Sequence, residues 1–498
     1  MNDQNDAVFI IYTGGTIGSL PKDKMDPDSP LVPQPLDVVM EMLPTYNKRD
    51  KNIIIGKKII RLGFYSWETP IDSSNIKLTD WIEIAKIIKA NYSSYDGFVV
   101  LHGTDTLAYT SSALSFILDN LSKPVVITGA QKPIGEARSD AVQNLITSIE
   151  IAAARTMGNE VVGEVCVFFR DELYRGCRTS KLSASSYSAF NSPNFPALGI
   201  AGEHIVINEK YVKKQQIVHS LQVSEKLEPN IASMDIFPGM SSVLLNNMLN
   251  TESLRGVVLQ TFGTGNAPST FEFLDAIKKA VENNRMIVDV TQCRSGEVEL
   301  GLYDVSAGLL SRGVISGMDM TPEAALTKMF VILGKETDIE KAKDLMQLNL
   351  RGEQRQSIFN LHFPGNEFSD DSTSVCIQPI RPMVHGSDRY NPSFLDKAIL
   401  RIMGIKIQNM KRGNVDIAVF IDLPDANEQT KQEGNPHFIG RKMKSWTSGG
   451  DSESIFFDVT KQVKEFVDNR HENSLTIVNM GGFPFQWDLT NIAFFADC

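Results

Sequence analysis

The sequence lacks several features that would mark it for particular partners. It has no excess of positive charge. There are 49 lysine and arginine residues and 60 aspartate and glutamate residues, which gives a net charge of −11. A surface that binds nucleic acid is normally basic, so this balance argues against a nucleic-acid partner. No apolar run approaches the roughly 18 residues that span a bilayer, so we expect no membrane partner or membrane-embedded segment.

Cysteine is scarce and is not arranged in pairs. The five cysteines form no CxxC motif and are odd in number, which fits reduced thiols in a cytoplasmic protein better than a disulfide framework. The cysteines are Cys166, Cys177, Cys293, Cys376 and Cys498.

The first residues, MNDQNDAVFIIY, contain no basic leader and no long apolar stretch, so we expect no secretory signal peptide.

The remaining composition is that of a globular protein with an ordinary core, since 42% of the residues are hydrophobic and 22% are charged. Within residues 1–208, apolar runs alternate with amphipathic segments. This alternation predicts an α/β domain with a largely parallel sheet and helices on both faces. The expected strands are 7–12, 53–60, 98–101, 125–128 and 165–169, and the expected helices are 79–90, 106–120 and 139–154.

A second α/β domain is expected over residues 225–358, and a change of composition follows it. Residues 363–373 contain proline, glycine and acidic residues, which is typical of a linker. Residues 374–498 then alternate apolar and polar positions between polar turns, which predicts an antiparallel β-sandwich as an accessory domain. Its expected strands are 398–408, 415–423, 453–459, 474–480 and 491–495. Histidine and cysteine do not cluster there, so we expect no metal site.

Two threonine motifs follow expected strands directly. TGGTIG (13–18) follows the first strand, and HGTDT (102–106) follows the strand at 98–101. In open α/β folds, ligands bind at the carboxyl edge of the strands, so the two motifs together predict a polar cleft in which threonine does the chemistry. Either motif alone would also fit a strand-to-helix cap, and capping and catalysis can coexist.

These motifs, with others in the same order, resemble the bacterial type I (cytoplasmic) L-asparaginases. The similarity runs from about residue 7 to about residue 353 and leaves the C-terminal β-rich domain outside it. It implies an asparaginase-like fold of two α/β domains, a homodimer or homotetramer, and L-asparagine as the substrate. The other blocks are DSSN (72–75), KPVVITGAQ (123–131), RSDAVQNL (138–145), LYRGCRTSK (173–181), AFNSPN (189–194), FGTGNAP (262–268), TQC (291–293) and MDMTPEAALTK (318–328).

The resemblance also implies which residues are catalytic. Thr16 matches the nucleophilic threonine of the family, and Thr104, Asp105 and Lys181 match its second threonine and the acid–lysine pair beside it. A threonine hydroxyl is a poor nucleophile unless a base takes its proton. A desolvated Lys181 beside a second hydroxyl can act as that base, with Asp105 balancing its charge. This chemistry requires no cofactor and no metal ion.

Five further residues are expected to hold the substrate. Its ammonium group needs acceptors, and its carboxylate needs donors such as hydroxyls and strand-end N–H groups. By resemblance, Asp72, Ser73 and Ser74 match the loop that holds the α-amino and α-carboxyl groups. We also expect Gly15 to line the cleft, and Asn266 to line it from the second α/β domain.

The chain departs from the family in the loop that follows the nucleophile. The family carries a tyrosine there, whereas this chain reads SLPKDKMDPDSPLVP (19–33), has no tyrosine between Tyr12 and Tyr46, and holds Met25 and Asp26 at the nearest positions. Two alternatives to an asparaginase therefore stay open. One is an amidohydrolase with another substrate, such as glutamine or another amide or ester, including a lysophospholipid. The other is an amino-acid-binding protein with impaired catalysis.

Other polar residues near these motifs receive different interpretations. Gln260 stands where the type I enzymes carry an effector-site arginine, so effector control is not implied. Glu297 stands where some periplasmic asparaginases place a glutamate that reaches a neighbouring subunit's site. We interpret His102 as structural, and Arg138 and Asp140 as a buried ion pair at a helix start.

Overall fold

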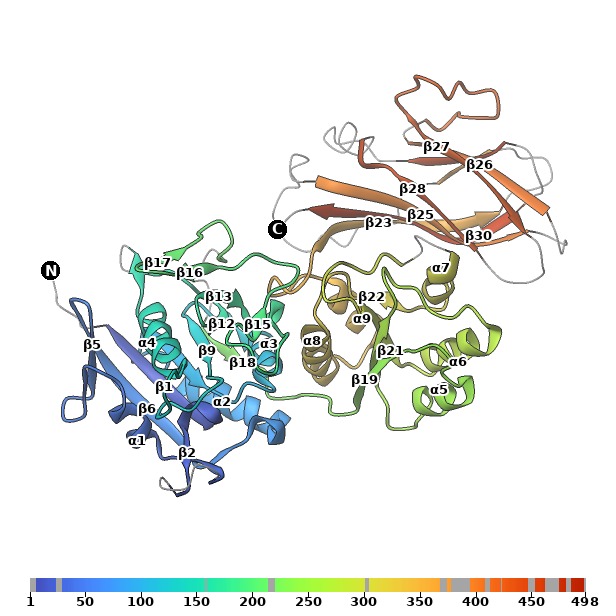
Figure 1. Cartoon of the computed structure of the whole chain (residues 1–498). Coiled ribbons are helices and arrows are strands. Elements are labelled where there is room, and N and C mark those ends of the chain that lie inside the picture. The colour runs from blue at the N-terminus through green and yellow to red at the C-terminus, as the bar shows by residue number, and fades with distance from the viewer. Residues whose placement is uncertain are drawn as a thin grey trace.

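The chain forms two α/β domains followed by a β-sandwich (Figure 1). The structure is a computed structural model, and it describes residues 6–23, 29–156, 159–213, 220–300, 304–367, 374–377, 395–407, 413–421, 423–446, 453–461, 474–480 and 485–496. None of the helices in these ranges has both the length and the apolar character needed to cross a bilayer.

The N-terminal domain is built on a ten-stranded sheet whose centre is parallel, as predicted. Strands β6, β1, β7, β9 and β12 run parallel to one another, and antiparallel strands extend the sheet at both edges. In sheet order the strands are β17 (Ile205–Ile207), β16 (Gly199–Ala201), β13 (Glu172–Arg175), β12 (Val165–Phe169), β9 (Val125–Thr128), β7 (Gly97–Leu101), β1 (Ala7–Gly14), β6 (Lys58–Ile71), β5 (Asn52–Ile55) and β4 (Tyr46–Asn47).

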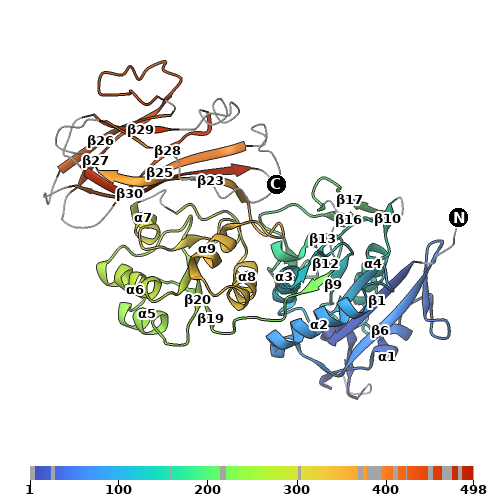
Figure 2. The same cartoon turned by 180° about the vertical axis from the view of Figure 1, so that it is seen from behind.

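Helices cover both faces of this sheet because successive side chains of a strand point to opposite faces. On β1, Phe9 and Ile11 join the core beneath α2 (Leu78–Asn91) and α3 (Leu107–Ile117), whereas Val8 and Ile10 join the core beneath α1 (Leu36–Glu41) and α4 (Ala141–Ala152). Figure 2 shows the sheet from behind Figure 1. The prediction of helices on both faces is confirmed.

One predicted strand of this domain was wrong. The apolar segment 53–60 was expected to be a single strand, but it is an antiparallel hairpin of β5 and the start of β6. The turn passes through Gly56 at φ 59°, a left-handed conformation that glycine adopts at low cost. Because β6 then continues to Ile71, the chain reaches the same sheet edge as the carboxyl end of β1.

The second α/β domain has a four-stranded sheet in the order β19–β20–β21–β22, all parallel. Helices α5 and α6 cover one face, and α8 covers the other and also packs on α3 of the first domain. The elements are β19 (Ile231–Asp235), α5 (Ser242–Leu249), β20 (Gly256–Thr261), α6 (Phe271–Glu282), β21 (Met286–Thr291), α7 (Asp304–Leu310), β22 (Ile315–Ser316), α8 (Pro322–Lys335) and α9 (Ile339–Gln347).

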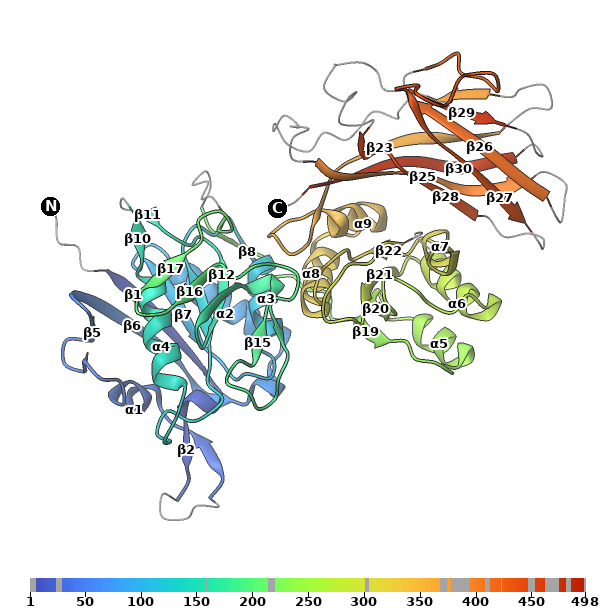
Figure 3. The same ribbon diagram turned by 45° about the horizontal axis from the view of Figure 1, so that its top comes forward.

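The C-terminal unit is an antiparallel β-sandwich, as predicted, with two four-stranded sheets beside α7 (Figure 3). Apolar side chains of both sheets are buried, including Ile402 and Val419. One sheet is ordered β23 (Gln356–Glu367), β30 (Phe485–Ala496), β25 (Leu395–Ile407) and β28 (Glu453–Asp458). The other is ordered β24 (Ser374–Ile377), β29 (Leu475–Asn479), β26 (Gly413–Ile421) and β27 (Phe438–Trp446).

The expected linker at 363–373 was wrong in its first half. Strand β23 already begins at Gln356 and pairs with β30 through Glu367, while 368–373 lie outside the described residues. The sequence signal misled because Pro364 is typical of loops. A proline is tolerated here because β23 is the edge strand of its sheet, where a missing N–H costs no ladder hydrogen bond on the open side.

Two buried ion pairs fix the segment that leaves the second domain. Lys328 on α8 lies 2.6 Å from Glu353, and both side chains are 0% exposed. Burial alone would raise the pKa of Glu353, but the Lys328 ammonium and the N–H groups of Leu350 and Arg351 hold it at about 2. Arg178 pairs with Asp319 at 2.7 Å and donates to the Gly352 carbonyl. The first domain is thereby tied to residues 350–353.

Replacing Lys328 with methionine is expected to destabilise the protein by about 3–5 kcal/mol, because the Glu353 carboxylate would stay buried without its counter-charge. The free energy of unfolding can be measured by urea denaturation followed by tryptophan fluorescence. Lys335→Met is the matched control, since Lys335 is 45% exposed and its ion pair with Asp119 should contribute less than about 1 kcal/mol. Equal effects of the two substitutions would contradict the importance assigned to the buried pair.

Candidate active site

Three loops meet at the carboxyl ends of β1, β6 and β7. The Gly15 N–H, after β1, donates to the Ile71 carbonyl at the end of β6 at 3.2 Å. Thr13 Oγ1 donates to the Leu101 carbonyl at the end of β7 at 3.0 Å. Thr106 Oγ1 donates to the Ser73 carbonyl at 2.7 Å rather than capping α3. The sheet therefore brings the two threonine motifs and the DSSN segment to one place.

Glycine permits the closest of these contacts. Gly15 has φ 86°, and a Cβ added there would lie 2.4 Å from the Cα of Gly103. A Cβ on Gly103 would lie 2.6 Å from Ser73 Oγ. Both distances are far below van der Waals contact. A side chain at Gly15 would push the Thr16 loop away from the Thr104 loop, and one at Gly103 would push the Thr104 loop away from Ser73.

Lys181 is held against the second threonine motif. It lies on the short strand β14 (Ser180–Lys181), which pairs with β15 (Phe190–Asn191). Its Nζ donates to Thr104 Oγ1 at 2.9 Å and to Asp105 Oδ1 at 2.7 Å. The Lys181 side chain is 17% exposed, whereas that of Asp105 is 63% exposed. The structure thus brings together the predicted lysine, acid and second threonine.

Strand β14 is also anchored from the second domain. Ser180 Oγ donates to Glu323 Oε2 at 2.9 Å, and Glu323 lies in the first turn of α8. Burial raises the pKa of Glu323. Sequence reasoning missed this contact, because neither residue belongs to a threonine motif. Helix α8 thereby helps to fix the strand that carries Lys181.

Thr16 begins a 3-10 helix (Thr16–Gly18) and is half-buried. Within the described part of the chain, its hydroxyl makes no hydrogen bond, so it is free to turn toward a ligand. The chain then enters the hairpin of β2 (Ser19–Pro21) and β3 (Leu31–Pro33). Met25 and Asp26, the residues at the expected position of the family tyrosine, lie outside the described residues.

The DSSN segment divides into exposed and buried members. Asp72 caps the 3-10 helix Ser73–Asn75 and accepts hydrogen bonds from the N–H and the hydroxyl of Ser74. These bonds, that from the hydroxyl first, lower the pKa of Asp72. Asp72 and Ser74 are exposed and able to meet a ligand, whereas Ser73 is buried beneath Gly103.

Asn266 and Glu297 are not brought to these loops within the chain. Asn266 follows β20, where its N–H donates to the Phe262 carbonyl at 2.8 Å, and its side-chain Oδ1 is buried without a hydrogen-bond partner. Glu297 pairs with Arg355 at 3.5 Å. Gln260 Nε2 donates to Ser233 Oγ. Among the described contacts, all of these stay within the second domain and the segment that follows it.

His102 is held as a neutral side chain. It is buried, and its Nδ1 donates to the Gly103 carbonyl at 2.7 Å, which leaves Nε2 to accept from Thr110 Oγ1 at 3.0 Å. Burial lowers the pKa of His102 to about 4. The geometry agrees with a structural interpretation of this histidine.

The expected buried ion pair of Arg138 and Asp140 was wrong. Arg138 is exposed, and no ion pair of its guanidinium occurs in the described ranges. Asp140 instead accepts hydrogen bonds from the N–H groups of Gln131 and Lys132 and from Asn144. The carboxylate therefore anchors the loop after β9 rather than a cation.

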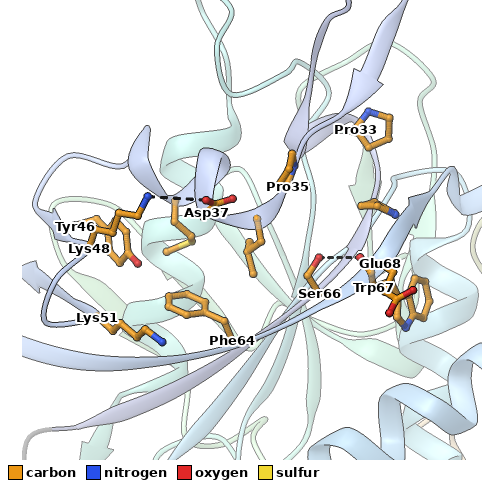
Figure 4. A pocket seen from close by; sticks show the side chains of 13 residues that line it. Pro33, Pro35, Asp37, Tyr46, Lys48, Lys51, Phe64, Ser66, Trp67 and Glu68 are labelled. Atoms are coloured by element: carbon orange, nitrogen blue, oxygen red, sulfur yellow. Dashed lines mark hydrogen bonds and ion pairs between the residues drawn. The ribbon is translucent and has the colours of Figure 1, made fainter.

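A hollow of about 660 Å³ lies between α1, β3 and the last residues of β6 (Figure 4). Leu36, Met40 and Phe64 form apolar walls; Lys48 and Lys51 lie at one end, and Trp67 and Glu68 lie at the other. Because β3 belongs to the hairpin after Thr16 and β6 leads to Asp72, the hollow adjoins two of the three loops.

No cluster of His, Cys, Asp and Glu able to hold a metal ion occurs among the described residues, and the four cysteines resolved there are free thiols.

Comparison with known proteins gives matches over both α/β domains. The family model for the N-terminal asparaginase domain matches residues 7–213, and that for the glutaminase/asparaginase C-terminal domain matches residues 230–346. L-asparaginase 1 of Escherichia coli K12 is 38% identical over 354 residues, which is 70% of this chain and 98% of that protein. The human 60 kDa lysophospholipase is 36% identical over 361 residues, which is 70% of this chain and 61% of that protein.

Solved structures agree with these matches. The crystal structure of L-asparaginase I from Vibrio cholerae has a TM-score of 0.62 at 37% identity, covering 70% of this chain and 99% of the other. The thermostable L-asparaginase of Thermococcus kodakarensis has a TM-score of 0.61 at 31% identity, with the same coverage. Both family-model matches end before the β-sandwich begins.

Replacing Gly15 with alanine is expected to lower kcat/KM for amide hydrolysis by about 100-fold, because the added Cβ would displace the Thr16 loop by an ångström or more. Steady-state assays of ammonia release would measure this. Gly56→Ala is the matched control, since Gly56 also has a positive φ but has no atom within 4 Å of an added Cβ. If both variants kept full activity, close packing of the loops would not matter for catalysis.

Stability is expected to fall as the pH drops from about 6.5 to about 4, because the unfolded chain takes up a proton at His102 over that range while the folded chain does not. The loss attributable to His102 is about 3 kcal/mol. Urea unfolding at pH 7 and pH 4.5 would show a smaller pH dependence for His102→Gln than for the wild type. The exposed His204 supplies the control variant, and an equal change in His204→Gln would refute the assignment.

Proposed function

The chain belongs to the type I L-asparaginase family, and we propose that it hydrolyses L-asparagine to L-aspartate and ammonia. Membership makes it an amidohydrolase, whereas the substrate and the residue roles are part of the proposal. The observation that supports it most directly is the pair of hydrogen bonds from Lys181 to Thr104 and Asp105. Thr104 and Asp105 lie on the loop whose Gly103 touches Gly15 of the Thr16 loop.

In the proposed reaction, the Thr16 hydroxyl oxygen attacks the side-chain amide carbon of asparagine. The hydroxyl proton passes to a base, and the carbonyl oxygen takes up the electron pair as an oxyanion. The C–N bond then breaks, and the nitrogen leaves as ammonia after gaining a proton. Water attacks the resulting Thr16 ester, which releases L-aspartate and restores the hydroxyl. No cofactor is needed for any of these steps.

Lys181 and Thr104 are assigned to proton transfer. The 2.9 Å contact between Lys181 Nζ and Thr104 Oγ1 lets a neutral Lys181 amine take the Thr104 proton while Thr104 takes one from the Thr16 hydroxyl or from an attacking water; the ammonium formed then returns a proton to the leaving nitrogen. Asp105 balances the ammonium charge and, being largely exposed, connects the pair to solvent. The family tyrosine is absent from this sequence, so the relay through Thr104 and Lys181 would carry the proton without it.

Asp72 and Ser74 are assigned to the zwitterionic part of the substrate. The lowered pKa of Asp72 keeps its carboxylate charged, so that it can accept hydrogen bonds from the α-ammonium group. The Ser74 hydroxyl can donate to the α-carboxylate. Asn266 does not reach these loops within the described chain, so it would line the cleft from a second copy in a homodimer or homotetramer. We include that assembly, and a cytoplasmic location, in the proposal.

A second candidate is the hydrolysis of a larger amide or ester. It is favoured by the hollow of about 660 Å³ beside the β2–β3 hairpin and strand β6, which leads to the DSSN segment (Figure 4). It is also favoured by the similarity to the proteins named 60 kDa lysophospholipase in mouse and human, at 41% and 36% identity. Kinetics with L-asparagine, L-glutamine and a lysophospholipid, measured side by side, would rank the candidates by kcat/KM.

Thr16→Ala is expected to lower kcat for ammonia release from L-asparagine at least about 1000-fold, because no other hydroxyl would occupy the attacking position. Thr16→Ser keeps the hydroxyl and should retain measurable turnover. A coupled ammonia assay of the purified full-length chain would give both values.

Unchanged turnover in Thr16→Ala would refute the threonine mechanism. If the wild type released no ammonia but asparagine raised its Tm, the chain would be an amino-acid-binding protein with impaired catalysis. If only the larger substrate were cleaved, and in a Thr16-dependent manner, the second candidate would replace the first.

A further inference from the structure

A second and smaller hollow, of about 340 Å³, lies away from the threonine motifs. It is enclosed by the end of α3 and the start of β8 (Leu118–Asp119), by β12 and β13, and by the segment that leaves α9. Its walls mix apolar and charged side chains. The residues are Ser115, Leu118, Asn120, Leu121, Gly163, Glu164, Val165, Arg175, Cys177, Lys213, Leu350 and Arg351.

Two of the three cations in these walls already have counter-charges. Arg175 pairs with Glu164 at 2.6 Å, and both side chains are less than a tenth exposed. Arg351 pairs with Asp119 and also donates to the Ser115 carbonyl. These two guanidinium groups therefore add no net charge to the hollow.

Lys213 is the cation that remains. Its Nζ has one hydrogen-bond partner within the described residues, the Leu350 carbonyl at 3.4 Å, and it forms no ion pair there. An ammonium group has three N–H donors, so this single long contact leaves it under-satisfied. Burial lowers the pKa of Lys213, and the carboxylate of Glu164, which is already paired with Arg175, offsets this only in part.

We propose that this hollow binds a small oxyanion, a single carboxylate or phosphate group, with Lys213 Nζ as its principal ligand. The charge count gives the class of ligand, because one positive charge is left over once the Arg175 and Arg351 pairs are formed. Water could fill the donors of Lys213, but it would not neutralise a charge walled by Leu118, Leu121 and Val165. The volume admits a group of this size with a short organic remainder.

The site would also connect two parts of the fold. Lys213 and Arg175 belong to the first domain, whereas Leu350 lies in the segment that follows α9. An anion held between them would add a link beside the buried ion pair of Lys328 and Glu353. We therefore expect its binding to appear as an increase in stability rather than as a change in the reaction at Thr16.

The test is thermal unfolding of the full-length protein in chloride, acetate or phosphate at equal ionic strength and pH. For the wild type, acetate or phosphate at about ten times its Kd is expected to raise Tm by roughly 2–4 °C relative to chloride. The two salts separate a carboxylate from a phosphate preference. No increase in either salt would overturn the proposal.

Two variants locate the anion. Lys213→Met should weaken binding of the effective anion at least tenfold, measured by isothermal titration calorimetry, whereas Lys213→Arg keeps the charge and should retain the Tm increase. Lys57→Met is the matched control, because Lys57 is exposed on the β5–β6 turn at the opposite side of the sheet. All three variants keep the threonine loops, so anions bound there affect them equally. A full Tm increase in Lys213→Met would show that the anion binds elsewhere.

Discussion

The parallel pairing of β1 with both β6 and β7 is the constraint on which the candidate site depends. Tyr12 is opposite Leu101 on β7, and Gly14 is opposite Ile71 on β6, so three strands end at one level of the sheet. The loops that follow must then share a small volume. The Thr16 and Thr104 loops fit because Gly15 and Gly103 let their backbones touch, and β14 then brings Lys181 to Thr104.

Much of this arrangement could be predicted because it is local. The strands at 7–12 and 98–101 are short apolar runs that end in glycine and threonine, so their carboxyl-edge location follows from the pattern. The position of Lys181 beside Thr104 could not be derived in that way. Seventy-seven residues separate them, and only the family resemblance indicated that they would meet. The contact of Ser180 with Glu323 was missed for the same reason, since it joins two domains.

The errors also have physical causes. The segment 53–60 is rich in isoleucine and was predicted as one strand, although Gly56 and the two lysines after it mark the reversal. Strand β23 contains a proline that an edge strand tolerates, and it was taken for part of a linker. Arg138 and Asp140 are neighbours of opposite charge, yet the carboxylate binds main-chain N–H groups instead. In the last two cases the outcome depends on tertiary contacts that composition does not record.

The order of strands in the sandwich has a consequence for the synthesis of the protein. Strand β30 lies between β23 and β25 and pairs with both, although it comes last of the three in the chain. When β23 leaves the ribosome, residues 368–484 must still be made before its partner exists, which takes on the order of ten seconds at typical elongation rates. During that interval the two α/β domains can fold. The sheet that contains β23 and β25 cannot form until β30 has been synthesised.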